Sequence, residues 1–314
     1  MLKDKKIFIT GGAGFLGSNL VRRYYGKNEI TVFSRDESKH YYLKKQFPNV
    51  NCIIGDVRNY DLLKRASAEH DIGIFTASLK QIDAVSNNVE EAVDIIIKGA
   101  INSRRVAEEN GFQSACFISS DKSRAATTLY GSMKFVAGES FIVNSEESEC
   151  LLSCAIYGNV LNSTGSIIPL IWDSIKRKYE LTLYSEDMTR FMIDIEEAMD
   201  LVEVSLKYRG VNSIPCLSSF KVKDMFDIFS EKFGLKYKIG VPRISEKIHE
   251  MMISKEEAPR VFYENGNYFM HYEKTFTPVV KFKSGDFSSA DTVLSKQELQ
   301  EMLESKNYFN PNEI

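Results

Sequence analysis

Short apolar runs alternate with amphipathic segments throughout the first half of the chain. The apolar runs are rich in β-branched residues, and they predict strands at residues 6–10, 30–34, 51–54, 72–77 and 115–119. The segments between them predict helices at residues 17–25, from about 36 to 45, and at 60–68, 89–110 and 126–144. Strands that alternate with helices in this way form a parallel sheet with helices on both faces. Right-handed crossovers then give a doubly wound α/β fold.

The pattern changes after about residue 159, where helices become shorter and Pro and Gly interrupt them. An aromatic-rich stretch at 262–282 adds to this irregular second half. We expect a smaller, lid-like region here and place a domain division near residue 160, with some later segments returning to the sheet.

A glycine-rich turn joins the first predicted strand to the first helix, with the sequence Gly11-Gly12-Ala13-Gly14-Phe15-Leu16-Gly17. Gly11 permits a tight turn, Gly14 lets the backbone approach a pyrophosphate, and Gly17 allows close packing of helix and strand. The free N–H groups of the helix N-terminus favour phosphate. The turn predicts that residues 1–160 form a dinucleotide-binding Rossmann domain and that residues 161–314 form a substrate-binding region interleaved with it.

The end of the second strand bears on the choice of cofactor. Ser34 and Arg35 come first at the strand tip and Lys39 lies one turn further on, and these groups suit the 2′-phosphate of NADP. Asp36 leaves NAD open, because an acid near this position can bind a ribose 2′-hydroxyl. Asp56 follows the third strand, where its carboxylate can meet the adenine amino group. Val57 beside it, Ala77 at the end of the fourth strand, and Tyr130 and Lys134 after the fifth strand complete the expected cofactor contacts.

Candidate catalytic residues cluster at the end of the fifth strand and on the helix that follows. Ser120 lies at the strand end, and Tyr130 and Lys134 share one helix face at i and i+4. A neighbouring ammonium lowers a tyrosine pKa, so Tyr130 is a candidate base. Tyr41 and Lys45 have the same spacing, so only the position beyond a strand end, where α/β sheets bind ligands, distinguishes Tyr130.

Asp121 and Lys122 add an acid and a second amine at the same strand end. An oxidoreductase or epimerase needs only the hydroxyl, the tyrosine and one lysine, whereas elimination of water also needs an acid and a base. A surface ion pair in a turn is the alternative interpretation of these two residues.

The composition and charge of the chain limit the classes of partner that we expect it to bind. The chain has 314 residues, 43% of them hydrophobic and 26% charged, with a formal net charge of −3, which gives no electrostatic reason to expect nucleic acid or an anionic membrane. The five cysteines lack zinc spacing, and the four histidines form no metal or triad spacing. We therefore expect no bound metal. We expect the histidines to lie at the surface or at helix caps, with His249 near the substrate. We also expect a cytoplasmic protein without a membrane span.

Seven short blocks together resemble one family, the nucleotide-sugar 4,6-dehydratases of polysaccharide biosynthesis, within the extended short-chain dehydrogenases/reductases. The closest likeness is to inverting UDP-N-acetylglucosamine 4,6-dehydratases, and it covers nearly the whole chain. The blocks are residues 33–37, 56–58, 79–81, 120–122, 157–160, 188–191 and 246–250.

The resemblance implies an internal redox cycle on a UDP-N-acetylhexosamine through bound NADP. Tyr130, aided by Ser120 and Lys134, would deprotonate the sugar C4 hydroxyl. Lys122 would remove the C5 proton and Asp121 would protonate the departing C6 hydroxyl. The residues that would hold the substrate are Lys80, Asn159, Arg190, Arg243 and Glu246. The resemblance also implies a homo-oligomer, assembled through the long helices predicted at 89–110 and 126–144.

The sequence departs from the family pattern at four places. Ile156 replaces an arginine, residues 163–166 read Ser-Thr-Gly-Ser without another arginine, Asp83 replaces a proline, and residues 95–98 lack an asparagine. None is a proton-transfer residue, but they leave the sugar, the nucleotide and the stereochemistry at C5 open. A 4-epimerase or 4-reductase that does not use Asp121 and Lys122 is the second hypothesis, and a cofactor-binding regulatory or scaffold protein is the third.

Overall fold

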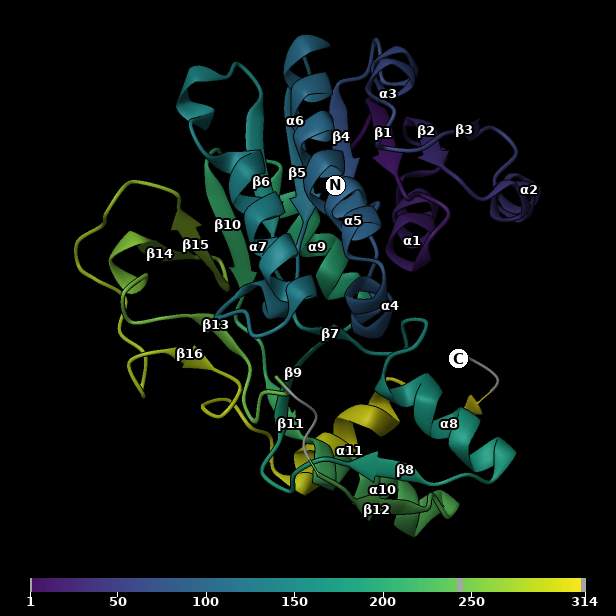
Figure 1. Ribbon diagram of the computed structural model, residues 1–314, viewed down its shortest axis with the longest axis vertical. Helices are drawn as coiled ribbons and strands as arrows, with labels where there is room; N and C mark the ends of the chain where they lie inside the picture. The colour runs from purple at the N-terminus through teal and green to yellow at the C-terminus, as the bar shows by residue number, and fades with distance from the viewer. Residues whose placement is uncertain (1, 242–244, 312–314) are drawn as a thin grey trace.

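The computed structural model describes residues 2–241 and 245–311 (Figure 1). Within these residues nine strands share one sheet: β1 Lys6–Thr10, β2 Glu29–Ser34, β3 Asn51–Ile54, β4 Ile72–Phe75, β5 Ser114–Ile118, β6 Leu151–Ala155, β10 Val211–Pro215, β14 Val261–Glu264 and β15 Asn267–His271. Their order is β14-β15-β10-β6-β5-β4-β1-β2-β3. In this order, the strands that run from β10 through β6, β5, β4, β1 and β2 to β3 are parallel to one another. The hairpin β14–β15 joins β10 in antiparallel orientation.

Helices cover both faces of this sheet. They are α1 Phe15–Tyr24, α2 Glu37–Gln46, α3 Tyr60–Ala66, α4 Ile82–Asn87, α5 Val89–Ala92, the π-helical η1 Val93–Lys98, α6 Gly99–Glu109, α7 Leu129–Ile142 and α9 Ile195–Ser205. Helices α6 and α7 pack together in front of the sheet in Figure 1, whereas α9 lies behind it and contacts α1. Ile7, Phe8 and Ile9 of β1 are all fully buried, as expected for a strand covered on both faces. The predicted doubly wound α/β fold is confirmed.

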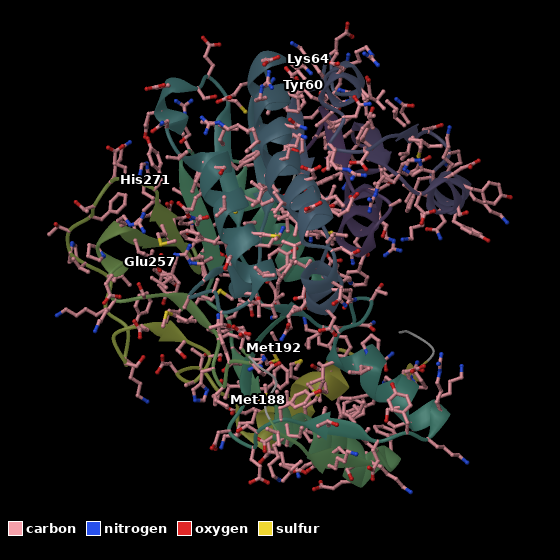
Figure 2. The ribbon with its side chains drawn as sticks, viewed as in Figure 1. Tyr60, Lys64, Met188, Met192, Glu257 and His271 are labelled. Atoms are coloured by element: carbon pink, nitrogen blue, oxygen red, sulfur yellow. The ribbon has the colours of Figure 1, made fainter. Side chains whose placement is uncertain are left out.

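A smaller lobe has its own hydrophobic core. It contains α8 Ile167–Arg177, β8 Leu181–Leu183, α10 Val222–Phe233, β12 Tyr237–Ile239 and α11 Lys296–Ser305. A short sheet of β7 Asn159–Val160, β9 Thr189–Ile193 and β11 Ser219–Lys221 leads into it. Met188 and Met192 lie where this lobe meets the rest of the molecule (Figure 2) and belong to its core. The remaining short elements are β13 Met251–Ile253, β16 Phe287–Ser288, and the 3₁₀ turns η2 Asp121–Ser123, η3 Ser145–Glu147 and η4 Ala258–Arg260.

The aromatic-rich stretch at 262–282 differs from its prediction as part of a lid. Its first half forms the hairpin β14–β15 at the edge of the main sheet, where the rings of Phe262 and Phe269 stack with centroids 5.1 Å apart. Phe262 pairs with Phe269 and Tyr263 with Tyr268 across the two strands, and these aromatic cross-strand pairs stabilise a hairpin despite the irregular sequence pattern. The division near residue 160 stays a prediction, since β10, α9 and this hairpin all return to the main sheet.

Candidate active site

The turn between β1 and α1 leaves backbone N–H groups open at the end of the sheet. Gly11 adopts φ +66°, and a Cβ on Gly17 would lie 2.5 Å from the Gly11 carbonyl oxygen, so only glycine fits at either position. Gly14 caps α1 without a side-chain hydrogen bond. The first amides of α1 therefore face the cavity with the positive end of the helix dipole, which fits a pyrophosphate.

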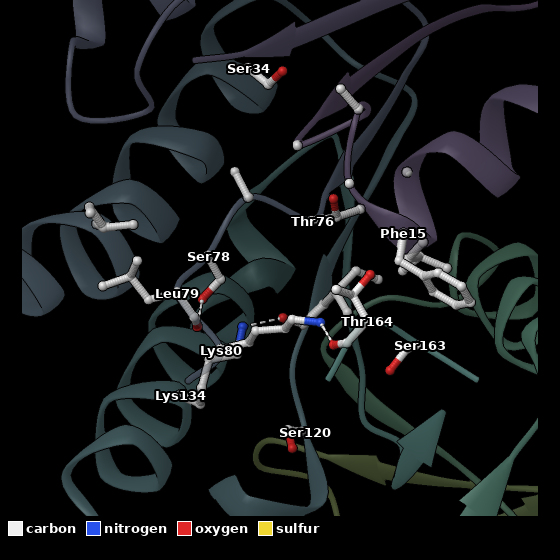
Figure 3. A pocket seen from close by; sticks show the side chains of 18 of the residues that line it. Phe15, Ser34, Thr76, Ser78, Leu79, Lys80, Ser120, Lys134, Ser163 and Thr164 are labelled. Atoms are coloured by element: carbon white, nitrogen blue, oxygen red, sulfur yellow. Dashed lines mark hydrogen bonds between the residues drawn. The ribbon is translucent and has the colours of Figure 1, made fainter. Parts of the chain in front are cut away.

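A cavity of about 750 Å³ extends from this turn along the carboxyl ends of the parallel strands. It lies where the strand order reverses between β1 and β4, the usual ligand position of a doubly wound sheet. Every residue predicted to bind the cofactor lines it: Gly11, Gly14, Phe15, Leu16, Gly17, Ser34, Arg35, Lys39, Asp56, Val57, Ala77, Tyr130 and Lys134. Figure 3 shows Phe15, Ser34, Ser120 and Lys134 around this space.

At one end of the cavity the polar groups follow β2. The Ser34 hydroxyl lies 2.6 Å from Nε2 of His40, which is only 4% exposed. Asp36 accepts a hydrogen bond from the backbone N–H of Lys39 at 3.0 Å and thereby caps α2. Arg35 is half exposed, and its guanidinium lies 3.8 Å from Asp56.

Two histidines differ from their prediction as surface or cap residues. His40 and His271 are both 4% exposed, because each ring packs inward from its element. On α2, only His40 and Leu43 are buried, so their i, i+3 spacing was the sequence signal that placed both on the inner face. Burial lowers the pKa of His40, and Asp36 opposes this only in part.

The candidate catalytic residues converge at the opposite end of the cavity. Ser120 and η2 follow β5 directly, and α7 carries Tyr130 and Lys134 alongside. The Asp121 Oδ1 atom accepts hydrogen bonds from the Ser120 hydroxyl at 2.9 Å and from Lys122 Nζ at 3.2 Å. Ser120, Lys122, Tyr130 and Lys134 line the cavity, whereas Asp121 is fully buried behind them. Asp121 and Lys122 are thus paired, but in the site rather than on the surface.

The electrostatic environment of Tyr130 differs from the expected one. Lys134 donates a hydrogen bond to the Ile118 carbonyl at 2.6 Å, and burial lowers the pKa of Lys134 to about 8. Burial also raises the pKa of Tyr130, while Lys122 lowers it and a hydrogen bond from Ser120 acts in the same direction. The pKa of Tyr130 is raised overall, and the cation that opposes this rise is Lys122 rather than Lys134.

The predicted substrate residues fall into two groups. Lys80 and Asn159 line the cavity, and Lys80 Nζ donates to the Thr164 carbonyl across it (Figure 3). Arg190 and Glu246 pair at 2.5 Å behind the wall and are not among the residues that line this cavity. Arg243 lies outside the described residues.

Comparisons with known proteins place this site in context. The family model described as "Polysaccharide biosynthesis protein" matches residues 7–271. The chain belongs to the polysaccharide biosynthesis protein family. A UDP-N-acetylglucosamine 4,6-dehydratase (inverting) of Campylobacter jejuni is 31% identical over 301 residues, which covers 92% of this chain and 88% of the relative.

Other members of this family and its structural neighbours extend the comparison. A UDP-glucose 4-epimerase of Rickettsia bellii is 30% identical over 336 residues and covers 98% of both chains. The X-ray structure of Pen from Bacillus thuringiensis superposes with a TM-score of 0.89 at 26% identity, covering 98% of this chain and 99% of that one. The family predicted from the sequence blocks is confirmed, and its members carry the names of both dehydratases and epimerases.

Several polar residues at the site of this protein were not predicted from its sequence. Thr76, Ser78, Ser163 and Thr164 line the cavity, and Glu250 lies buried beside Lys122. Glu250 ends one of the seven blocks that carry the family resemblance, so its position in that block was the available signal. Among the described helices, none is both long and apolar enough to cross a membrane.

Proposed function

We propose that the protein is an NADP-dependent nucleotide-sugar 4,6-dehydratase that converts UDP-N-acetylglucosamine to a UDP-4-keto-6-deoxy-N-acetylhexosamine. The observation that carries this proposal is the convergence of Asp121 and Lys122 with Ser120 and Tyr130 at one end of a cavity of about 750 Å³. This end holds an acid and an amine beyond the groups that oxidation at C4 needs. Elimination of water from C5 and C6 requires such a pair.

We assign a residue to each proton transfer of the proposed reaction. Tyr130 and Lys134 would hold the nicotinamide, which would supply reversible hydride transfer so that C4 is oxidised and C6 is reduced without an external oxidant. Tyr130 would take the proton of the C4 hydroxyl; burial raises its pKa, and Lys122 and the Ser120 hydroxyl oppose this shift. Lys122 would take the proton from C5, which the C4 ketone acidifies. Asp121 would donate a proton to the C6 hydroxyl as it leaves, so that one water is lost and no net oxidation occurs. If Lys122 returns its proton to the opposite face of C5, the product is inverted.

The choice of NADP is supported by the groups after β2. Asp36 uses its side chain to cap α2, so this carboxylate is engaged by protein rather than free for a ribose hydroxyl. Arg35 and Lys39 line the same part of the cavity, and their positive charges favour a 2′-phosphate. Asp56 is held by Arg58 at 2.8 Å, which lowers the pKa of its carboxyl against the opposing effect of burial.

The nucleotide-sugar substrate would occupy the part of the cavity near Lys80 and Asn159. Asn159 Oδ1 lies 3.5 Å from Lys122 Nζ, which ties this wall to the catalytic residues. Burial lowers the pKa of Lys80, and the nearby Lys39 acts in the same direction. An anionic diphosphate bound beside Lys80 would favour the charged form of this lysine. Arg190, Arg243 and Glu246 are proposed to complete the substrate site.

The proposal extends to assembly and location. The paired helices expose apolar side chains, including Ile101 on α6 and Phe135 and Val136 on α7, which favours burial of this face in a homo-oligomer. The cysteines are free thiols, which suits a cytoplasmic protein. The negative net charge gives no support for nucleic acid or anionic membrane as partner.

A nucleotide-sugar 4-epimerase is the second candidate, because relatives that cover 98% of this chain carry that name. It would use Tyr130 and Lys134 and leave Asp121 and Lys122 without a chemical role. Incubation with UDP-N-acetylglucosamine in deuterated water, followed by mass spectrometry and proton NMR, separates the two. Loss of one water with deuterium at C5 supports the dehydratase, and an unchanged mass with C4 epimerised supports the epimerase.

A variant at Lys122 and a control variant at the surface separate the dehydratase from the epimerase more directly. Lys122→Met should abolish water loss from UDP-N-acetylglucosamine in the dehydratase, yet it should leave an epimerase active. Lys98→Met on the exposed surface is the control, because its ammonium is 3.8 Å from Asp94 and 57% of the side chain is exposed. Absence of any change in the sugar with wild-type protein would contradict both candidates for this substrate.

A further inference from the structure

Glu250 is a buried carboxylate with no step assigned to it in the proposed reaction. It precedes β13 and is 4% exposed. Its backbone is fixed on both sides by Ser289: Glu250 N–H donates to the Ser289 hydroxyl at 2.9 Å, and Ser289 N–H donates to the Glu250 carbonyl at 2.8 Å. The side chain is thus held in a definite place within the protein.

Three cations surround this carboxylate. Oε1 lies 3.6 Å from Lys122 Nζ and 3.8 Å from Arg190 Nε, and Oε2 lies 3.3 Å from Lys247 Nζ. Burial opposes the charged form of Glu250, but these cations outweigh burial and lower its pKa. Glu250 is therefore a carboxylate anion at neutral pH. Within the described chain, its Oε2 atom is buried without a hydrogen bond.

Two of these cations already have other anchors. Arg190 pairs with Glu246 at 2.5 Å and donates to the Lys247 carbonyl at 3.0 Å. Lys247 Nζ donates to the Arg124 carbonyl at 2.7 Å. Lys122 differs from both because its ammonium borders the cavity, and about a quarter of its side chain is exposed. A carboxylate behind such an amine restricts where the amine points.

We propose that Glu250 is a positioning residue of the active site, whose carboxylate holds Lys122 Nζ between Asp121 and the cavity and thereby governs proton transfer at C5. This inference rests on the proposed dehydratase reaction. The groups that face Lys122 are Asp121 beside it, Glu250, Arg190 of β9 and Tyr130 of α7, with Asn159 Oδ1 at 3.5 Å. Of the two carboxylates beside Lys122, Glu250 is the one that belongs to the predicted substrate-binding region, residues 161–314.

The pair has a definite effect on base strength. Burial lowers the pKa of Lys122, but Asp121 and Glu250 together outweigh burial and raise it. A raised pKa makes the neutral amine a stronger base toward C5, while it reduces the fraction of neutral amine at neutral pH. Removal of the Glu250 charge should therefore lower the pKa of Lys122 and move the pH at which the amine becomes neutral downward. A carboxylate that only fills space would not change this pH.

The first experiment measures Lys122 without any substrate. Purified wild-type protein, Glu250→Gln and Glu250→Asp are trace-acetylated with acetic anhydride from about pH 6 to about pH 11, and acetylation at Lys122 is followed by peptide mass spectrometry. We expect the midpoint for Lys122 to fall by about one pH unit in Glu250→Gln, since an opposite charge at this distance shifts a pKa by about one to three units. Glu250→Asp keeps the charge but withdraws it by one carbon, so it should lower the midpoint by less than Glu250→Gln does. Equal midpoints in wild type and Glu250→Gln would overturn the proposal.

A matched control is available nearby. Glu256 pairs with Lys255 at 3.8 Å and its side chain is 70% exposed, so Glu256→Gln should leave the Lys122 midpoint unchanged. Circular dichroism and the thermal midpoint establish that each variant is folded. If Glu250→Gln does not fold, Glu250→Asp carries the test, because withdrawal of the carboxylate by one carbon should lower the Lys122 midpoint measurably. An unchanged midpoint in a folded Glu250→Asp protein would then refute the proposal.

The second experiment follows C5 deuteration of UDP-N-acetylglucosamine as a function of pH. Glu250→Gln should move the acidic limb of the rate to lower pH by the same shift and lower kcat about tenfold, because a misplaced base slows proton transfer. KM should change less than about threefold, since Glu250 does not line the cavity. If wild type itself does not deuterate C5, the dehydratase function fails, while the acetylation midpoint still decides the role of Glu250.

Discussion

Arg35→Ala is the most direct test of the proposed cofactor choice. The Arg35 side chain is 56% exposed, and its ion pair with Asp56 spans 3.8 Å, which is too long for a hydrogen bond. Asp56 is instead bound by Arg58 at 2.8 Å. The guanidinium donors of Arg35 are therefore available for the 2′-phosphate of NADP, and their removal disturbs little else.

The size of the effect follows from this geometry. A hydrogen bond to a charged group contributes about 1.5–3 kcal/mol, and the exposure of Arg35 places it at the lower end, about 1.5 kcal/mol. This corresponds to roughly a tenfold weaker Kd for NADP. NAD lacks the 2′-phosphate, so its Kd should change less than about twofold. The difference between the two cofactors should narrow at about 1 M salt, because salt screens exposed charges.

Isothermal titration calorimetry of cofactor-free protein with NADP and with NAD measures both constants. Arg65→Ala is the control, because Arg65 lies near the end of α3, is exposed and does not line the cavity. An equal loss for NADP and NAD in Arg35→Ala, or no loss for either, would refute the assignment of the 2′-phosphate site to Arg35.

Three further predictions concern stability and cofactor binding. Glu257→Gln removes one of the two carboxylates that pair with the buried Arg124 guanidinium, and Glu139 at 3.7 Å remains. It should lower the free energy of unfolding by about 2 kcal/mol in urea denaturation, whereas the exposed Glu256→Gln should change it by less than about 0.5 kcal/mol. Gly17→Ala places a Cβ 2.5 Å from a backbone oxygen of the phosphate turn and should weaken cofactor binding at least about tenfold by calorimetry. Lys134 has a pKa of about 8 in the folded protein, below its unfolded value of 10.5, so the unfolded state holds more protons between these values. The stability of wild type relative to Lys134→Met should therefore rise between pH 8 and 10.5 in urea titrations, and a constant difference would contradict the buried, neutralised lysine.

The sequence determined the elements of the first half and the order of the site residues along the chain. Alternation of apolar strands with helices is a local property, and glycine at positions 11 and 17 is required by the tight turn between the first strand and the first helix. Ser120, Tyr130 and Lys134 were predictable because the end of a parallel strand and the next helix must lie side by side. These inferences need only the chain within about 30 residues.

The tertiary structure decided what lies beside these residues. Strands β14 and β15 lie between β12 and α11 of the smaller lobe in sequence but extend the main sheet, which local patterns after residue 160 could not show. The burial of His40 against Ser34, the bond of Lys134 to the Ile118 carbonyl and the contact of Glu250 with Lys122 join groups from different elements. Glu250 and Lys122 are separated by more than a hundred residues. Their proximity depends on how the chain packs, and the charge and pKa of each group depend on that packing in turn.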